Sequence, residues 1–141
     1  MSAFPMILIV VILYNLVAFG SGMGGHGDMQ SILNNGFQIR MFSGDIWKIT
    51  VSDLFVTLAL ALLFVEIVKA ARNTHREILN HAFSMVSFCI ALVEFIVLKR
   101  FSTSAFFLIT AMCLFDVVAG YTISIVAARR DLGVMPVERE R

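Results

Sequence analysis

The sequence predicts an all-α, polytopic integral membrane protein built as a bundle of four transmembrane helices. Of its 141 residues, 59% are hydrophobic, and the mean hydropathy is +0.88. This content exceeds the roughly 45–50% of soluble domains, and it is concentrated in blocks long enough to cross a bilayer. Nearly all lysines and arginines lie at the edges of these blocks, which is typical of membrane proteins. The four predicted spans cover residues 3–20, 47–69, 80–98 and 103–128.

The first predicted span is expected to be a retained helix rather than a signal peptide. No basic segment precedes its apolar run, whereas signal peptides begin with one. Pro5 is tolerated in its first turn, and the small residues from Gly20 onward are expected to end it. The second span starts at Trp47, whose amphipathic ring favours the level of the lipid headgroups.

The loop between these spans, residues 21–46, is expected to be exterior and partly ordered. Asp28 can cap a short amphipathic turn that Asn34, Asn35 and Gly36 would stop. Apolar and polar residues then alternate. We expect this segment to lie along the membrane surface. The apolar residues of the turn are Met29, Ile32 and Leu33, and those of the alternating stretch are Phe37, Ile39 and Met41.

The distribution of basic residues predicts the orientation of the chain. It places both termini, including a charged tail at 131–141, in the cytoplasm. One side carries Lys69, Arg72, Arg76, Arg129, Arg130, Arg139 and Arg141, and the other carries Arg40, Lys48, Lys99 and Arg100. Because charges are placed in this way, rather than on one basic face, nucleic acid is not an expected partner.

Three carboxylates, Asp53, Glu94 and Asp116, lie within the predicted spans. A carboxylate at the centre of a span costs about 2.5–3.5 kcal/mol on insertion scales, so it is expected to face other helices rather than lipid. Each acid shares a helical face with small or polar residues. The three faces are Thr50, Asp53, Thr57 and Ala61; Asn80, Ser84, Ser87, Ala91 and Glu94; and Asp116, Gly120, Ser124 and Ala128. The last of these also permits close helix packing.

Two interpretations of these acids remain open from the sequence. They can hold helices together as interhelical hydrogen-bond partners or as partners of snorkelling basic residues. Alternatively, they can line a route for protons or cations, with Asp53 and Glu94 as neighbours near the outer end and Asp116 deeper. Glu66 is a separate case, because it lies one turn from Lys69 and is expected to pair with it at the interface.

A metal site is a minor hypothesis. Met23, His26 and Met29 have a spacing that would suit Cu(I), which prefers soft sulfur ligands, but a flexible glycine-rich connector explains the same residues. Cys89 and Cys113 both lie in apolar blocks, so neither a disulfide framework nor a metal motif is predicted. No other cofactor is expected. Catalysis is not expected either, because no serine or threonine has a nearby histidine to activate it.

The layout resembles that of the small, phosphate-starvation-inducible PsiE-like membrane proteins. The likeness runs from residue 50 to 130 and includes a span that ends Phe64-Val65-Glu66-Ile67-Val68-Lys69 before a basic turn. This resemblance implies a four-helix protein of the bacterial inner membrane and assigns no functional residue. Two functions follow as hypotheses. The first is an interaction or accessory protein that self-associates or joins a larger membrane complex, and the alternative is a proton- or cation-coupled transporter or channel.

Overall fold

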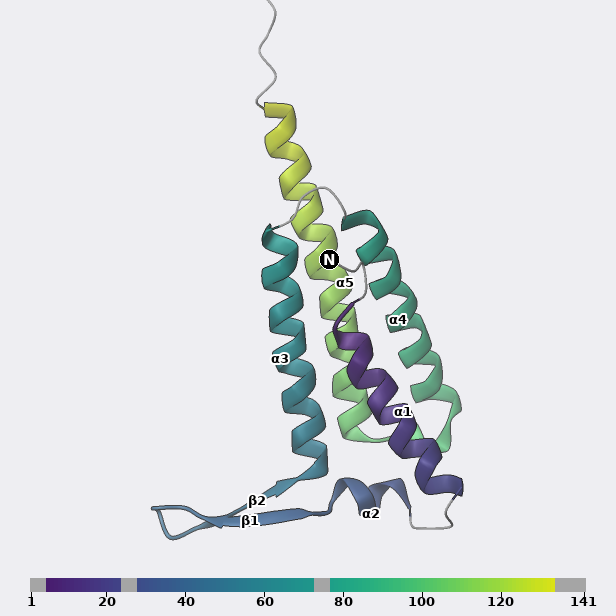
Figure 1. The fold of residues 1–141 in the computed structure, drawn as a ribbon, viewed down its shortest axis with the longest axis vertical. Helices are drawn as coiled ribbons and strands as arrows, with labels where there is room; N and C mark the ends of the chain where they lie inside the picture. Colours follow the sequence, from purple (N-terminus) through teal and green to yellow (C-terminus); the bar gives the residue numbers. More distant parts are fainter. Residues whose placement is uncertain (1–4, 24–27, 73–76, 134–141) are drawn as a thin grey trace, which may run out of the picture.

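The computed structural model describes residues 5–23, 28–72 and 77–133, and these are mostly helical (Figure 1). The all-α prediction is therefore confirmed, with one short hairpin as an exception. The elements are α1 (Ile7–Met23), α2 (Met29–Leu33), β1 (Gly36–Arg40), β2 (Ile46–Thr50), α3 (Val51–Arg72), α4 (Glu77–Val97), the 3₁₀ turn η1 (Lys99–Phe101) and α5 (Ser104–Gly133).

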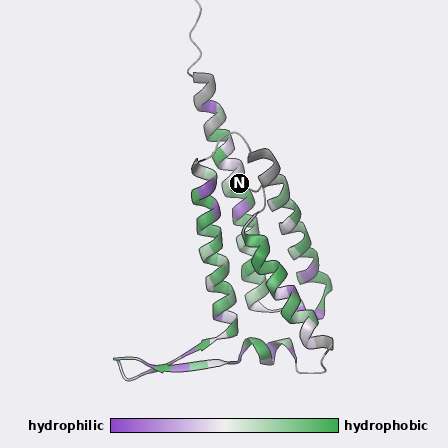
Figure 2. Ribbon diagram, in the orientation of Figure 1, coloured by the Kyte–Doolittle hydropathy of each residue, from purple (hydrophilic) through white to green (hydrophobic). Residues whose placement is uncertain are grey.

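Among the described residues, two helical segments are long and apolar enough to cross a membrane. They are Val51–Ala70 in α3 and Ser104–Val126 in α5. Two shorter apolar helices, Ile7–Ser21 and Ala82–Val97, accompany them. Figure 2 shows the apolar residues spread along all four long helices, with polar residues gathered mainly toward the ends of the bundle. The presence of four spans therefore remains a prediction.

The helices α3, α4 and α5 pack side by side, with α5 in contact with both α3 and α4. The helix α1 lies across this layer and contacts all three (Figure 1). Its inward stripe follows the i, i+3, i+4 spacing of an amphipathic helix. The residues of the stripe are Ile7, Val10, Val11, Tyr14 and Ala18, none more than 2% exposed.

The ring of Tyr14 is the centre of an aromatic cluster inside the bundle. It packs against Phe55, Phe101 and Phe106 with ring centroids 5.3, 5.5 and 4.6 Å away. These rings come from α3, η1 and α5, so a single side chain of α1 joins three other elements. The pair with Phe55 is edge-to-face, and pairs of that geometry add about 0.5–1.5 kcal/mol beyond the area that they bury.

The helix α3 begins at Val51 rather than near residue 47 as predicted, because the preceding five residues form a strand. Residues Ile46–Thr50 pair antiparallel with Gly36–Arg40, and Trp47 faces Ile39 across the hairpin. Asp53 then caps the helix. Its Oδ2 accepts hydrogen bonds from the backbone N–H and the hydroxyl of Thr50, at 2.9 and 2.7 Å. The Asp53 N–H donates back to the Thr50 hydroxyl at 3.2 Å, which completes a reciprocal capping box.

The other helix bounds lie near the predicted ones. The helix α1 continues through Gly20 to Met23, because a glycine weakens a helix without ending it. The helix α5 continues to Gly133 and extends beyond the ends of its neighbours (Figure 1). Thr103 caps its start by accepting a hydrogen bond from the Phe106 N–H at 3.2 Å.

The junction of the hairpin with α2 requires a glycine at position 36. A Cβ there would overlap the backbone of Ile49 and Thr50, whereas a Cβ at Gly20 would meet nothing within 4 Å.

We predict that Gly36→Ala destabilises the junction by about 1–3 kcal/mol, the usual cost of overpacking. Gly20→Ala is the matched control and should be neutral or slightly stabilising, because alanine favours a helix. Limited proteolysis of the purified protein in detergent measures the difference, and equal cleavage rates for the two variants would contradict it.

Candidate functional site

The polar contacts inside the bundle gather on α1, although α1 itself has no acidic residue in its first turn and no basic residue in its last. A helix carries partial positive charge at its N-terminal end and partial negative charge at its C-terminal end, and its first N–H groups lack partners within the helix. Other elements of the chain place a side chain of opposite charge near each end of the α1 dipole. We consider this set of contacts the candidate site.

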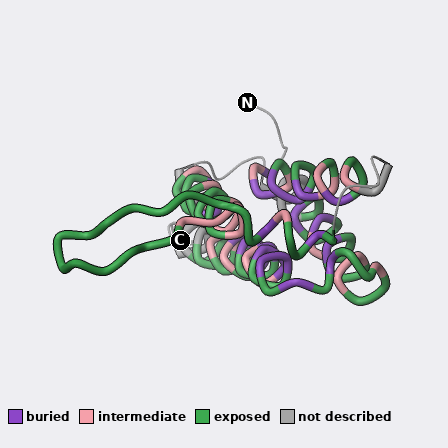
Figure 3. Tube along the Cα trace, turned by 90° about the horizontal axis from the view of Figure 1, so that it is seen from below, coloured by how far each residue is buried: buried purple, intermediate pink, exposed green. Residues whose placement is uncertain are grey.

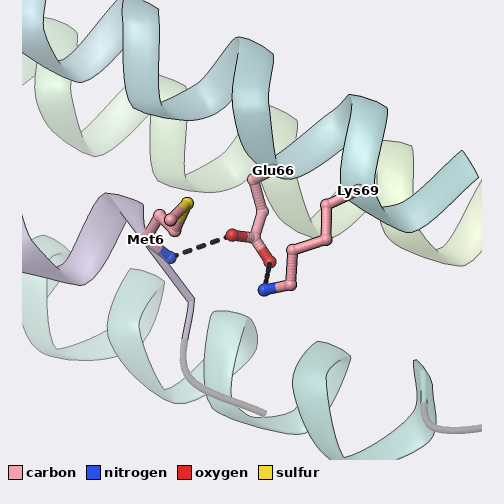
Figure 4. Close-up of polar contacts among 3 residues, drawn as sticks. All are labelled: Met6, Glu66 and Lys69. Atoms are coloured by element: carbon pink, nitrogen blue, oxygen red, sulfur yellow. Dashed lines mark hydrogen bonds and ion pairs between the residues drawn. The ribbon is translucent and has the colours of Figure 1, made fainter. Parts of the chain in front are cut away.

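The N-terminal end of α1 is bound by Glu66 of α3 (Figure 4). One carboxylate oxygen accepts a hydrogen bond from the Met6 backbone N–H at 3.0 Å, and the other lies 3.3 Å from the Lys69 Nζ. Pro5 has no N–H, so Met6 supplies the first backbone donor of the described chain. Glu66 is only 1% exposed. It therefore acts as a buried cap for a helix that lies 60 residues away in the sequence.

Near the opposite end of α1, which is at Met23, Arg100 of η1 contacts the last two turns of the helix. Its guanidinium donates hydrogen bonds to the Ala18 carbonyl at 2.7 Å and to the Ser21 hydroxyl at 3.3 Å. A cation near the C-terminal end of a helix interacts favourably with the helix dipole and with the carbonyl groups there. Arg100 is itself exposed, so the contact lies at the edge of the bundle.

Two further contacts bind the middle of α1. The Asn15 side-chain amide donates hydrogen bonds to the Val11 carbonyl and to a Glu94 oxygen of α4, both at 3.0 Å. The Tyr14 hydroxyl lies 2.6 Å from the Thr103 hydroxyl, which also caps α5. The helix α1 therefore has a polar partner on α3, on α4, on η1 and at the start of α5.

The three acids predicted to face inward differ in their placement. Asp53 is exposed and bonds to Thr50 within its own capping box, so the predicted inward face of this span is wrong, and Thr57 is exposed as well. The reason is that α3 buries the face that carries Ala59, Leu63 and Glu66 instead. Glu94 is half-buried and bonds to Asn15. The predicted pair of Asp53 and Glu94 is therefore replaced by two separate contacts.

Asp116 lies in α5 and is only 5% exposed. The predicted polar stripe of α4 is also covered, since Ser84 and Ser87 are buried, and the Ser87 hydroxyl donates to the Phe83 carbonyl at 2.7 Å. On the predicted packing face of α5, exposure increases from Gly120, which is buried, through Ser124, which is half-buried, to Ala128, which is exposed. Only the first part of this face is therefore covered by the other helices.

The predicted copper ligands are not tested by the structure. His26 lies outside the described residues, as does the side chain of Met23, although its backbone ends α1. Met29 is buried in α2 at 2% exposure. Within the described ranges, no three histidine, cysteine, aspartate or glutamate side chains gather where a metal ion could bind.

Sequence reasoning missed most of the contacts on α1. The ion pair of Glu66 with Lys69 was predicted and is present, but the hydrogen bond to Met6 was not foreseen. Asn15 is the only amide side chain of α1, and this was a signal that could have been used, because a polar group in an apolar helix needs a partner. Arg100 was predicted as a basic residue at a membrane edge that could pair with an acid in a span, whereas it donates hydrogen bonds to the Ala18 carbonyl and the Ser21 hydroxyl.

No family model matches the chain, and comparisons with curated proteins and with solved structures found no match. The layout resemblance to PsiE-like proteins therefore stays a prediction.

The capping role of Glu66 predicts a specific order of stabilities. Glu66→Gln keeps an oxygen that can accept from the Met6 N–H, whereas Glu66→Leu has similar bulk and leaves that donor without this acceptor. We expect Glu66→Leu to lower the free energy of unfolding by about 1–3 kcal/mol, the cost of an unsatisfied buried group, and Glu66→Gln to lower it by less. Val65→Leu, at an exposed neighbouring position, is the control. Unfolding in a detergent and denaturant mixture measures the order, and a Glu66→Leu variant as stable as the wild type would refute the capping role.

The hydrogen bond of Asn15 with Glu94 should appear as a coupling energy. A double-mutant cycle with Asn15→Ala and Glu94→Ala should give about 0.6 kcal/mol and at most about 1.7 kcal/mol, the average and the maximum for interhelical hydrogen bonds measured in a membrane protein. A control cycle that pairs Asn15→Ala with Asp53→Ala should be additive, because these residues have separate partners. Additivity in both cycles would show that the Asn15 contact does not stabilise the fold.

Proposed function

We propose that the chain is a four-span integral membrane protein that works as a small interaction or accessory subunit, without enzymatic activity, and that associates with itself or with a larger membrane complex. The observation that carries the proposal is the different placement of polar and apolar side chains in the bundle. Glu66 and Glu94 bind α1 and Asp53 caps α3, while most large side chains on the exposed helix faces are apolar.

The exposure of α3 supports a location in the bilayer. Only 17% of its apolar segment, Val51–Ala70, is buried. An apolar core helix of a soluble protein would be mostly buried. Leu54, Leu60 and Phe64 are each more than half exposed. Leaving such side chains in water would forfeit about 25 cal/mol for every Å² of apolar surface, so lipid or another protein is expected to cover them.

The dimensions of the shorter helices support four spans rather than two. At 1.5 Å per residue, the 17 residues of α1 rise about 25 Å and the 21 residues of α4 about 31 Å. The whole length of α4 matches the roughly 30 Å hydrocarbon core, its apolar segment Ala82–Val97 is shorter, and α1 is near the lower limit for a span. Both helices pack against the longer α3 and α5, so all four would share one membrane.

The contacts of the acids favour a structural role over a transport pathway. A route from outside would need Asp53 and Glu94 close together, yet Asp53 is exposed at the start of α3 and Glu94 bonds to Asn15. Asp116 is the one of the three acids that is buried. It keeps proton or cation transport as the alternative, because an ionisable group buried in a span is a functional candidate by default.

The proposal predicts association without ion flux. In blue native electrophoresis of solubilised native membranes, the tagged chain should migrate in assemblies larger than its monomer. In liposomes, copies labelled at the exposed Cys89 should show energy transfer above that of randomly placed monomers if the partner is a second copy. Dissipation of a pH gradient should equal that of empty liposomes.

The alternative function gives a different outcome in the same preparations. A monomeric chain in native membranes, together with a proton flux that Asp116→Asn abolishes and Asp53→Asn leaves intact, would overturn the accessory role and support transport. Asp53→Asn is the matched control, because it removes the same charge from an exposed position.

A further inference from the structure

The hairpin formed by β1 and β2 leaves the bundle sideways at the end where α3 begins. Its two strands are almost superimposed in Figure 1 and well separated in Figure 3, which is turned by 90°. The plane of this small sheet therefore lies across the helix axes. If α3 crosses a membrane, that plane is roughly parallel to the membrane surface.

The register divides the hairpin into two unlike faces. Cross-strand partners share a face, and successive residues alternate between faces. The pairs Phe37 with Ile49 and Ile39 with Trp47 make one face wholly apolar. The pairs on the other face are Gly36 with Thr50, Gln38 with Lys48, and Arg40 with Ile46. The hairpin is thus an amphipathic sheet with its two basic residues on the more polar face.

The apolar face is not covered by the described parts of the chain. Phe37 and Trp47 are 55% and 53% exposed, and Ile39 is 41% exposed. Phe42, at the turn, is fully exposed as well. An isolated two-stranded hairpin is at best marginally stable in water. A surface of this kind therefore gains stability from a partner that takes its apolar side.

We propose that this partner is the lipid bilayer, and that the hairpin lies flat on it, with the apolar face at the boundary of the acyl chains and with Arg40 and Lys48 among the phosphate groups. The inference rests on the proposed span of α3. No linker separates the sheet from that span, since β2 ends at Thr50 and α3 starts at Val51. This continuity fixes the sheet at the level where the span enters the membrane.

The side chains of the hairpin match the chemistry of that level. A tryptophan ring favours the interface because it has an apolar body and one polar N–H group. Lysine and arginine on the polar side of an interfacial element reach lipid phosphates with their long stems. Asp45 lies at the tip of the hairpin, where its carbonyl accepts a hydrogen bond from the Met41 N–H, one position beyond the pair of Arg40 with Ile46. The bilayer can therefore cover the apolar face of the sheet and bind the basic residues of its other face at the same time.

The single tryptophan of the chain makes the test direct. The full chain is reconstituted in vesicles of phosphatidylcholine and phosphatidylglycerol, and resistance to alkaline carbonate extraction first establishes insertion. Trp47 emission should then be quenched strongly by lipids brominated near the headgroup, less by lipids brominated near the bilayer centre, and weakly by aqueous iodide. The double variant Phe37→Ser, Ile39→Ser should lose the bromolipid quenching and shift the emission to longer wavelength. Gln38→Ser, on the other face, should change neither.

Each contrary outcome identifies a different error. An inserted protein whose Trp47 is open to iodide and insensitive to bromolipids would show a hairpin in water and overturn the inference. Protection from both quenchers would overturn it in favour of a protein partner, such as a second copy. Extraction of the chain by carbonate would instead refute the proposed span, and the inference would fall with it.

Discussion

The bundle depends on how the two ends of α1 are neutralised. The helix is apolar, contributes the most deeply buried stripe of the core, and carries no charge of its own at either end. Its terminal N–H and C=O groups would cost free energy if they were left in an apolar environment. Glu66 supplies the negative charge at one end and Arg100 the positive charge at the other. Because these residues belong to α3 and η1, capping α1 also fixes where it packs.

The same principle accounts for three acidic residues of the helices. Asp53 satisfies the start of α3, Glu66 satisfies the start of α1, and Glu94 satisfies an amide in the middle of α1. A carboxylate is stabilised by N–H donors and by the positive end of a helix dipole. Each of these three carboxylates binds a group of the chain itself. This is the physical reason for favouring an assembled, accessory role over a conducting one.

The pattern of apolar and polar residues along the sequence made much of the fold predictable. The apolar blocks gave the four long helices with bounds close to the observed ones, because burial and helix length both follow from composition and period. The start of α3 could also have been predicted, since Thr50 and Asp53 have capping-box spacing, but the apolar run beginning at Trp47 concealed it. The alternation of Phe37 and Ile39 was recognised without its partner strand, so the hairpin was missed.

The candidate site was much less predictable than the helices. The contact of Glu66 with Met6 joins residues 60 positions apart, and that of Arg100 with Ala18 joins residues 82 apart. Helix periodicity says which residues share a face but not which helix that face meets. The inward face of α3 was consequently assigned to Asp53 and Thr57, whereas packing against α1 and α5 buries the face that carries Glu66.

The most direct test of this account is the position of α1 relative to α4 in a bilayer. Spin labels at Cys89 and at the exposed position Leu16→Cys, with Cys113→Ala as background, report the distance between the two helices by pulsed electron spin resonance. The account predicts one narrow distance distribution when Glu66 and Arg100 are present and a broad one when both are replaced by alanine. A distribution that is equally narrow in both proteins would show that the charges at the two ends of α1 do not hold it in place.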